Sequence, residues 1–346
     1  MQYKRIGEQT VMFELPPKLI SSAAIVGDVE GKGSLAEYYD LVLEDDTWGE
    51  KSWEKAERKM FENSVRMALE KINLSAKDLD CLLGGDLLNQ IISANYAARE
   101  LRIPFLGLYG ACSTMAQSLL IGSMMIDGGF AKRVACTATS HFSTAERQYR
   151  FPLEMGGQTT PTAQRTVTGA GTSILCEANS VGSAVFKSVR IMGGTIGRVV
   201  DFGISDASNM GAAMAPAARD TFLAHLQDTG RTADDYDLVI TGDLGKFGAE
   251  MFVDLCEEKG VKVGDKHLDC GNIVFAPEQK VDCGGSGCGC SAVVLNAYLL
   301  GRMEAGEINR VLFMATGALM SPTTGLQSES IPGIAHGVIL ERRMLQ

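Results

Sequence analysis

The chain has 346 residues, 45% of them hydrophobic and 21% charged, and its 32 Lys and Arg against 42 Asp and Glu give a formal net charge of −10. That composition is ordinary for a globular protein with a large core and excludes wholesale disorder, and the length fits about two domains. The acidic balance argues against nucleic acid as a partner, because neutralising phosphates requires a basic surface.

Neither the start of the chain nor its cysteines indicate export. The first residues contain no apolar run of the kind that a signal peptide needs, and no stretch approaches the ~18 apolar residues of a membrane helix. The nine cysteines are odd in number, and Cys136 and Cys176 lie inside apolar runs, as expected for reduced thiols. We therefore expect a cytoplasmic-type soluble protein.

A pattern of helix, short turn and buried strand occurs in each half of the sequence. The helices are predicted at 60–72 and 215–226, and the strands at 81–83 and 238–240. The two copies align without a gap at a shift of 157 residues (235 − 78), which places Gly85-Asp86-Leu87 on Gly242-Asp243-Leu244. An amphipathic helix followed by a short apolar run is typical of an α/β protein.

A second match follows in the same order, at a shift of 178 residues (290 − 112). In it Cys112-Ser113, Gly128 and the apolar run 133–137 align with Cys290-Ser291, Gly306 and the run 311–315. Each glycine is expected to end a helix as its C′ residue, and each apolar run predicts a buried parallel strand. Because the shift grows by 21 residues (178 − 157), the second half should contain extra chain, around 245–285.

The duplication predicts an α/β fold of two βαβαβ halves, packed as one layered body in which helices cover parallel strands. We place the halves at residues 1–180 and 181–346, and no low-complexity linker separates them. About a pseudo-two-fold axis, residues 60–87 should superpose on 217–244, and residues 112–137 on 290–315.

Cys112 lies where a short strand leads into a helix of small residues, which is expected to begin at or just after it. Unpaired N–H groups and the helix dipole stabilise an anion at such a position, which lowers a cysteine pKa and suits a nucleophile. The same position also suits a site that binds a carboxylate without chemistry. A buried structural cysteine is the third interpretation.

The Ala111-Cys112-Ser113 elbow, the duplicated halves and the loop 167–171 together resemble the thiolase and ketoacyl-synthase superfamily. The resemblance covers nearly the whole chain and implies a thiolase-like fold. It also implies that the elbow cysteine carries an acyl group, assisted by two polar residues from the second half, a histidine with a second histidine or an asparagine.

The second half departs from that pattern. Where the ketoacyl-synthase III type places a histidine after the strand 238–240, this chain has Thr241-Gly242-Asp243, and the glycine-rich loop 281–287 contains no asparagine. His225 is expected on a helix surface, and His267 stays open as a catalytic candidate. A thiolate needs an activating partner and a stabilised oxyanion, so we expect a binding protein. An acyltransferase or ketoacyl-synthase-like enzyme with Cys112 as acyl carrier is the alternative.

Three longer segments, 161–171, 209–217 and 284–290, resemble the stage V sporulation protein AD family of spore-forming bacteria. The resemblance implies non-enzymatic binding of dipicolinic acid (pyridine-2,6-dicarboxylate), alone or as its calcium chelate, for uptake into the developing spore. It also implies a forespore protein peripherally associated with the inner spore membrane, in a channel complex with other stage V sporulation membrane proteins. We further expect a homodimer.

A flat ligand with two carboxylates needs hydroxyl, N–H or guanidinium donors beside an apolar slot. Such donors are dense between residues 137 and 171, and the predicted strand end at 139–141 should open into the same cleft as Cys112. For the arginines of that stretch, including Arg147 and Arg150, a surface salt bridge is the stronger expectation. The candidate ligand-binding residues are Cys112, Ser113, Thr139, Ser140, His141, Arg165, Thr168 and Asn209.

A cysteine cluster at 283, 288 and 290, with His267 and Cys270 upstream, invites a zinc interpretation, which would require four convergent ligands. Cys290, however, is already explained by its match to Cys112, and the glycines of this loop permit close backbone approach between the halves. We expect no metal and no cofactor.

Overall fold

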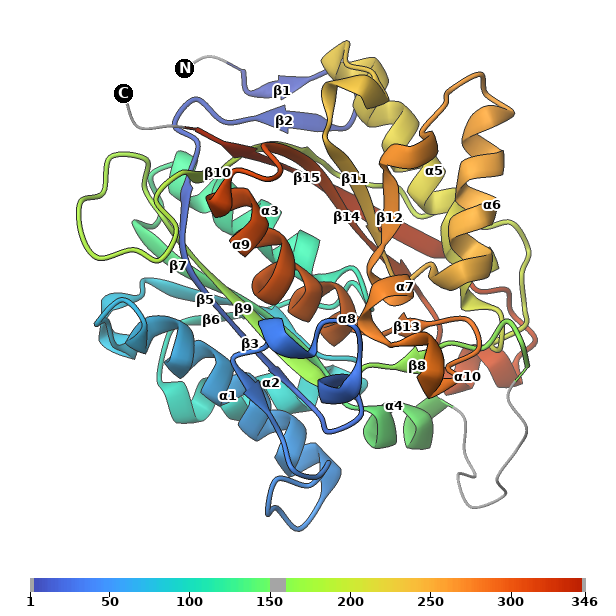
Figure 1. The fold of residues 1–346 in the computed structure, drawn as a ribbon, viewed down its shortest axis with the longest axis horizontal. Coiled ribbons are helices and arrows are strands. Elements are labelled where there is room, and N and C mark those ends of the chain that lie inside the picture. The colour runs from blue at the N-terminus through green and yellow to red at the C-terminus, as the bar shows by residue number, and fades with distance from the viewer. Residues whose placement is uncertain (1–2, 150–159, 344–346) are drawn as a thin grey trace.

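The computed structural model describes residues 3–149 and 160–343, which form two similar sets of strands and helices (Figure 1). The main elements of the first half are β3 (Lys18–Val26), α1 (Trp53–Glu70), β5 (Cys81–Gly85), α2 (Ile92–Leu101), β6 (Phe105–Gly107), α3 (Thr114–Asp127), β7 (Arg133–Ser140) and β9 (Gly169–Cys176). Those of the second half are β10 (Val189–Thr195), α5 (Met210–Thr229), β11 (Leu238–Gly242), α6 (Gly245–Glu257), β12 (His267–Asp269), α8 (Cys288–Val293), α9 (Leu300–Ala305), β14 (Arg310–Ala318) and β15 (Gly333–Arg342).

Shorter elements decorate the ends of these two sets. They are β1 (Arg5–Ile6), β2 (Thr10–Met12), β4 (Leu41–Val42), α4 (Phe142–Tyr149), β8 (Arg165–Thr166), α7 (Cys270–Val274), β13 (Gly285–Ser286) and α10 (Pro322–Leu326). β8 pairs with β13 in a small separate sheet, which ties the two halves together beside the candidate site.

The strands of each half pair in the same order, β6-β5-β7-β9-β3 in the first and β12-β11-β14-β15-β10 in the second. In both sets the first two pairings are parallel and the last two antiparallel. The sets meet between β3 and β10, where Lys18 pairs with Arg190. This symmetry confirms the predicted α/β fold of two duplicated halves. The predicted boundary at residue 180 falls in the segment between β9 and β10 and stays a prediction.

The expectation of parallel strands holds on one side only of β7 and β14. Each is parallel to β5 or β11 and antiparallel to β9 or β15. A parallel neighbour requires a long crossover, usually a helix packed on the sheet. The helix that follows β7, α4, contacts mainly β8 and α1 at the end of the sheet, so the chain re-enters the sheet in the opposite direction.

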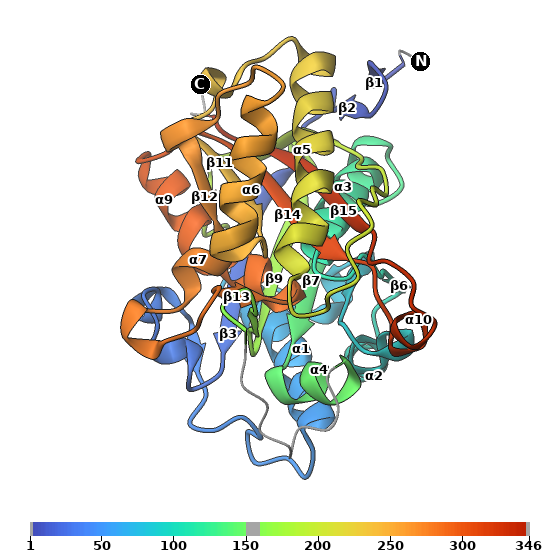
Figure 2. The same cartoon turned by 90° about the vertical axis from the view of Figure 1, so that its right-hand side faces the viewer.

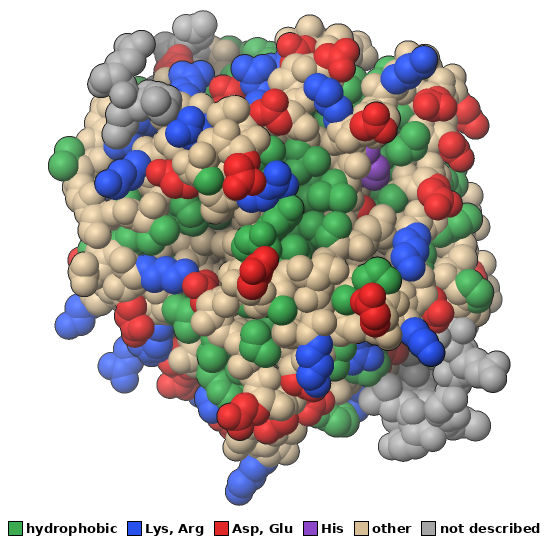
Figure 3. All heavy atoms as spheres, viewed as in Figure 1, with side chains coloured by type: hydrophobic (Ala, Val, Ile, Leu, Met, Phe, Trp, Pro, Cys, Tyr) green, Lys and Arg blue, Asp and Glu red, His purple; other side chains and the backbone are tan. Residues whose placement is uncertain are grey.

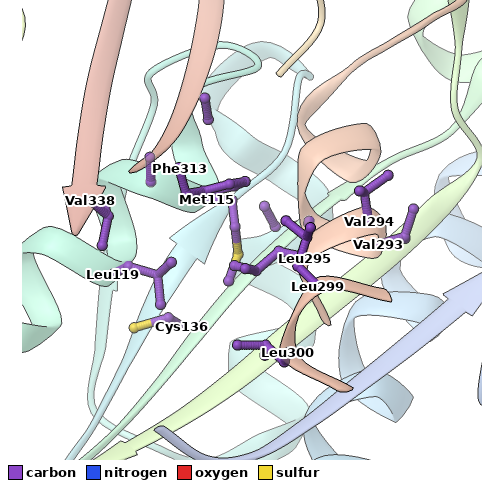
Figure 4. Packing of buried hydrophobic residues seen from close by; sticks show 14 of the residues in the cluster. Met115, Leu119, Cys136, Val293, Val294, Leu295, Leu299, Leu300, Phe313 and Val338 are labelled. Atoms are coloured by element: carbon purple, nitrogen blue, oxygen red, sulfur yellow. The ribbon is translucent and has the colours of Figure 1, made fainter. Parts of the chain in front are cut away.

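The body is layered, with helices outside and between the two sets of strands. α1 and α2 cover the outer face of the first set, α5 and α6 cover that of the second, and α3 and α8 contact strands of both (Figures 1 and 2). In the core, Met115 and Leu119 of α3 lie with Leu295 and Leu299, and with Phe313 of β14 (Figure 4). Burial of these apolar side chains, at about 25 cal/mol per Å², holds the halves together as one body.

The first sequence repeat is confirmed residue for residue. α1 begins at Trp53 and α5 at Met210, and β5 begins at Cys81 and β11 at Leu238, so both pairs differ by 157. In each half a capping box of Ser or Thr with Asp holds the turn between helix and strand.

The second repeat is confirmed in its order, but its predicted shift of 178 is wrong by one or two residues. Left-handed residues mark the equivalent turns: Ala111 (φ +48°) with Gly287 (φ +100°), and Gly129 (φ +77°) with Gly306 (φ +82°). The shifts are therefore 176 (287 − 111) and 177 (306 − 129). A π-helix at Val294–Leu299 accounts for the change, because its wider turn accommodates one more residue.

Two predictions change with this shift. Cys112 is equivalent to Cys288 and not to Cys290, since each follows the left-handed residue of its turn. Gly128 is right-handed, so the C′ position of α3 belongs to Gly129. The predicted extra chain lies mainly between β12 and Cys288, where residues 270–287 correspond to residues 108–111 of the first half.

Charges of both signs are mixed on the face of the molecule drawn in Figure 3. On the face in Figure 3, Lys and Arg side chains alternate with Asp and Glu, and hydrophobic side chains gather near the centre. Within residues 3–149 and 160–343, no helix is both long enough and apolar enough to cross a bilayer.

Candidate functional site

A cavity opens beside Cys112 at the carboxyl ends of the strands, and both halves line it. Its walls are Leu87, Tyr109, Ala111, Cys112, Ala145, Glu146, Tyr149, Thr166, Ala207, Met210, Ser286, Ala318 and Met320. The enclosed part measures about 40 Å³, which is room for about three water molecules. A larger ligand therefore requires side chains at the mouth to move, and the exposed ring of Tyr109 is placed to do so.

The turn that carries Cys112 is rigidly held. Ala111 adopts a left-handed conformation, which is rare for a residue with a Cβ, and α3 begins two residues after the cysteine, at Thr114. The hydroxyl of Ser113 donates to the carbonyl of Gly110 (2.7 Å), and that of Thr114 donates to the carbonyl of Ala111 (2.7 Å). Cys112 itself retains 7% of its surface, where it meets the cavity.

The thiol of Cys112 stays protonated. Burial raises its pKa well above the ordinary value, the carboxyl of Asp243 and the thiol of Cys288 raise it further, and the Gly287 N–H opposes them only partly. The helix N-terminus therefore does not activate this cysteine as the sequence position alone would suggest. Of the three interpretations, the nucleophile is disfavoured, because the sulfur that lines the cavity is neutral.

Asp243 stands directly behind this sulfur. Its side chain is fully buried, and burial raises its pKa well above the ordinary value. Gln164 donates from its Nε2 to the backbone carbonyl of Asp243, and Asp269 accepts from the next two backbone N–H groups, those of Leu244 and Gly245 (3.0 Å each). The position of Asp243 is thus fixed from both halves.

The cavity wall is apolar and aromatic with a few oxygen groups. The hydroxyl of Tyr149 donates to the Leu87 carbonyl (2.6 Å) and lies 3.1 Å from the Tyr109 hydroxyl. Thr166 and Ser286, neighbours in the small β8–β13 sheet, supply hydroxyls. Among the described lining residues, Glu146 is the one with a formal charge, and none is Lys or Arg.

Four of the predicted ligand-binding side chains near Cys112 form hydrogen bonds with backbone groups instead. The hydroxyls of Ser113, Thr139 and Ser140 donate to the carbonyls of Gly110, Gly169 and Val167. His141 accepts from the Ser143 N–H at Nδ1 and bonds the Asp46 carbonyl through Nε2 (2.6 Å). Burial lowers the pKa of His141. None of the four lines the cavity beside Cys112 in the described structure.

The other predicted contacts lie elsewhere. Arg165 and Thr168 line a second, acidic cavity together with Asp28, Glu30 and Asp46, and the Arg165 guanidinium sits 3.8 Å from the centre of the Phe142 ring. Asn209 caps α5, accepting from the Ala212 N–H (3.3 Å), while its neighbour Met210 reaches the first cavity. Arg147 pairs with Glu54 at the surface, and Arg150 lies outside the described residues.

The second-half histidines serve the interior. The prediction of a surface position for His225 is wrong: it is fully buried and bonds Thr195 (2.8 Å) and the Tyr236 hydroxyl (2.5 Å), because the helix face that carries it packs on the sheet. His267 bonds the Thr241 hydroxyl (2.9 Å) and His336 accepts from Gly197. Burial lowers the pKa of each of these three histidines to about 4, so they are neutral near pH 7.

The cysteines at 283, 288 and 290 are the candidates for metal ligation that the sequence offers. All nine cysteines are free and buried, and no group of three or more His, Cys, Asp or Glu side chains in residues 3–149 and 160–343 is arranged to hold a metal ion.

Several lining residues were not predicted. Leu87 lines the cavity and belongs to the Gly-Asp-Leu repeat, whose second copy contains Asp243, the acid behind the Cys112 sulfur. Glu146 and Tyr149 lie on α4, within the donor-rich stretch 137–171, whose arginines were among the predicted donors. For Ala318 and Met320, at the end of β14, no sequence signal was available, since only the fold brings that strand to Cys112.

The sequence pattern of one family, described as Stage V sporulation protein AD, matches residues 7–341. Over 339 residues, 98% of both chains, the protein is 47% identical to the Stage V sporulation protein AD of Bacillus subtilis (strain 168). The chain belongs to the stage V sporulation protein AD family. Membership of this family confirms the prediction from segments 161–171, 209–217 and 284–290.

Solved structures establish the fold class of this family member. The 3-oxoacyl-[acyl-carrier-protein] synthase III of Aquifex aeolicus is 16% identical, with a TM-score of 0.57 over 94% of this chain and 99% of its own. Human mitochondrial 3-ketoacyl-CoA thiolase is 13% identical (TM-score 0.60; 96% and 99% covered), and cerulenin-bound OleA of Xanthomonas campestris is 14% identical (0.62; 95% and 97%). The chain therefore has a thiolase-like fold, as predicted, and likeness at this identity transfers no activity.

Proposed function

We propose that this family member binds dipicolinate, without chemistry, in the cavity beside Cys112. The observation that carries the proposal is the combination of a protonated elbow sulfur with a mostly apolar cavity wall. Aromatic and aliphatic side chains suit a flat ring, and the hydroxyls of Thr166, Ser286 and Tyr109 can meet carboxylate oxygens. With no histidine on the described wall, the site lacks the base that an acyl-transferring thiolate requires.

We expect the low charge of the cavity wall to determine whether dipicolinate binds as the free dianion or as its calcium chelate. A dianion would lose the hydration of both carboxylates on entering a wall that is mostly apolar and that contains no Lys or Arg among its described residues. In the calcium chelate, the two carboxylates neutralise Ca²⁺, the ring nitrogen is an uncharged ligand, and the metal accepts further oxygen ligands. The proposal is therefore that the neutral calcium chelate is the preferred ligand.

Assembly and location follow from family membership as proposals. The chain acts in the forespore, attached peripherally to the inner spore membrane beside other stage V sporulation membrane proteins that form the channel. It pairs as a homodimer through the edge strand β6, where Leu106 is 50% exposed, since an unpaired strand edge offers N–H and C=O groups to a second copy. Sedimentation of the Leu106→Asp variant as a monomer would support this edge as the interface.

Calorimetric titration tests the ligand directly. The purified protein is titrated with dipicolinate, with and without an equimolar amount of calcium, and we expect saturable one-site binding that is tighter with calcium. Titration with isophthalate, which lacks the ring nitrogen, is the matched control and should give weaker binding. No saturable heat in either calcium condition would refute the proposal.

A further inference from the structure

We propose that Asp243 is a positioning residue that holds the sulfur of Cys112 as an uncharged thiol, so that the elbow offers a contact surface and not a nucleophile. The inference concerns the sulfur alone and stands whether or not a dicarboxylate is the ligand.

The geometry around Asp243 is unusual for a buried acid. Its side chain is 0% exposed, yet neither carboxyl oxygen has a well-formed hydrogen bond, although buried polar groups are generally satisfied. The groups that face these oxygens are the thiols of Cys112 and Cys290 and the backbone N–H of Gly287. Hydrogen bonding to its neighbours therefore does not explain why a carboxyl group is buried at this position.

Within residues 3–149 and 160–343, the charged neighbours that act on Asp243 include no cation. The titratable groups that face Asp243 come from the Cys112 turn, from α8, from α7 and from the end of β12, and they are Cys112, Cys288, Cys290, Cys270 and Asp269. All are acids when they ionise. Each proton lost in this cluster therefore opposes the loss of the next.

The thiol is the weaker acid of the pair, so it never ionises first. Because the carboxyl ionises before the thiol, a thiolate at Cys112 would have to form beside the negative charge of Asp243, which opposes it. A histidine at this place, as in the ketoacyl-synthase III pattern, would do the reverse, because an imidazolium lowers a cysteine pKa. The exchange of one residue after β11 thus changes the chemical character of the elbow.

Alkylation of Cys112 by iodoacetamide reports the thiolate directly. The sulfur of the thiolate forms a bond to carbon, the carbon–iodine bond breaks, iodide leaves, and the thiol proton has gone to solvent. Rates are followed between pH 6 and pH 10 by mass spectrometry of the peptide that contains Cys112, the cysteine that meets the cavity. Asp243→Asn keeps the shape and removes the charge, and Asp86→Asn, the equivalent acid of the first half, is the matched control.

We expect slow labelling of wild-type Cys112 over this pH range, and a rise of about tenfold or more near pH 9 in Asp243→Asn, since a unit charge has been removed beside the sulfur. Asp86→Asn should leave Cys112 labelling unchanged. Equal rates in the wild type and Asp243→Asn would overturn the proposal.

A measurement on the wild type alone keeps the proposal testable if Asp243→Asn does not fold. Thiolate absorbance near 240 nm is compared between the wild type and Cys112→Ser. We expect no difference between them below about pH 9.5, given the ordinary cysteine pKa of about 8.5. A difference that titrates at or below pH 8.5 would overturn it.

Discussion

The two halves place a cysteine opposite an acid in the same way, yet only one of these pairs serves a cavity. Cys112 of the first half faces Asp243 of the second, and Cys288 of the second half faces Asp86 of the first, whose charge raises the pKa of the Cys288 thiol after burial does. Both cysteines follow a left-handed residue, and both acids end a Gly-Asp sequence after an inner strand. Pseudo-two-fold symmetry thus produced two equivalent pairs.

The difference lies in the partners of each pair. Asp86 accepts from the backbone N–H groups of Leu88 (2.8 Å) and Ala94 (2.7 Å), and Cys288 is fully buried and donates to the Thr139 carbonyl (2.9 Å). Neither carboxyl oxygen of Asp243 has a well-formed hydrogen bond among the described residues, and Cys112 meets the cavity. The Cys288–Asp86 pair is part of the core, and the Cys112–Asp243 pair opens onto the cavity.

The largest expected effect comes from a bulky side chain at each cysteine. Cys112→Trp should weaken binding of calcium dipicolinate by about 100-fold or more, because the indole fills the cavity and its mouth. The fold should survive, as monitored by circular dichroism. Cys288→Trp should instead lower the free energy of unfolding by about 3 kcal/mol or more, because the core has no space for it. If both variants lose stability equally, the comparison fails.

A second expectation concerns Asp86 and pH. Burial raises the pKa of Asp86 to about 6, above its unfolded value of about 3.9, so the folded state keeps a proton that the unfolded state has lost between about pH 4 and pH 6. The wild type therefore loses stability as pH rises through this window, and Asp86→Asn does not titrate there. Relative to this variant, wild-type stability should fall by about 2–3 kcal/mol between pH 4 and pH 7.

Urea unfolding at several pH values measures this difference. Asp78→Asn is the control with the opposite sign, because hydrogen bonds from Ser75 lower the pKa of Asp78 and its contribution is lost as pH falls. A stability difference between wild type and Asp86→Asn that does not change with pH would contradict the assignment of Asp86 as a buried, partly protonated acid.

The smallest effects are expected for substitutions that leave the cavity intact. Cys112→Ser should change ligand affinity by no more than about threefold, since one neutral side chain replaces another of similar size. Arg165→Ala should also leave affinity within about threefold, because the guanidinium packs on Phe142 in the second cavity. A loss of binding in Arg165→Ala alone would move the site to that second cavity.

The fold could be predicted from the sequence because each half contains the same short motifs in the same order. The ungapped 157-residue repeat carries a helix, a capping box and a strand, each of which forms through near neighbours. The second repeat could be misaligned because a single residue is absorbed by the π-helix Val294–Leu299, which leaves no mark in the hydrophobic pattern.

The site was harder to predict, for a physical reason. Ser140 and His141 were expected at the cleft because they end a strand, yet their polar atoms satisfy backbone groups that the fold buries. Conversely, Met320 and Tyr149 reach Cys112 only through the packing of β14 and α4. The role of Asp243 depends on the lack of well-formed hydrogen bonds to its carboxyl oxygens. The spacing of residues in the sequence does not predict that.

A crystal structure of the protein with saturating calcium dipicolinate tests the central claim most directly, because it shows where the ligand lies. We predict density for a planar ring in the first cavity, between Cys112, Tyr149 and Ser286, with no bond between ligand and sulfur. Density at the Arg165–Phe142 cavity with the Cys112 cavity empty would contradict the account, and so would a covalent adduct on Cys112.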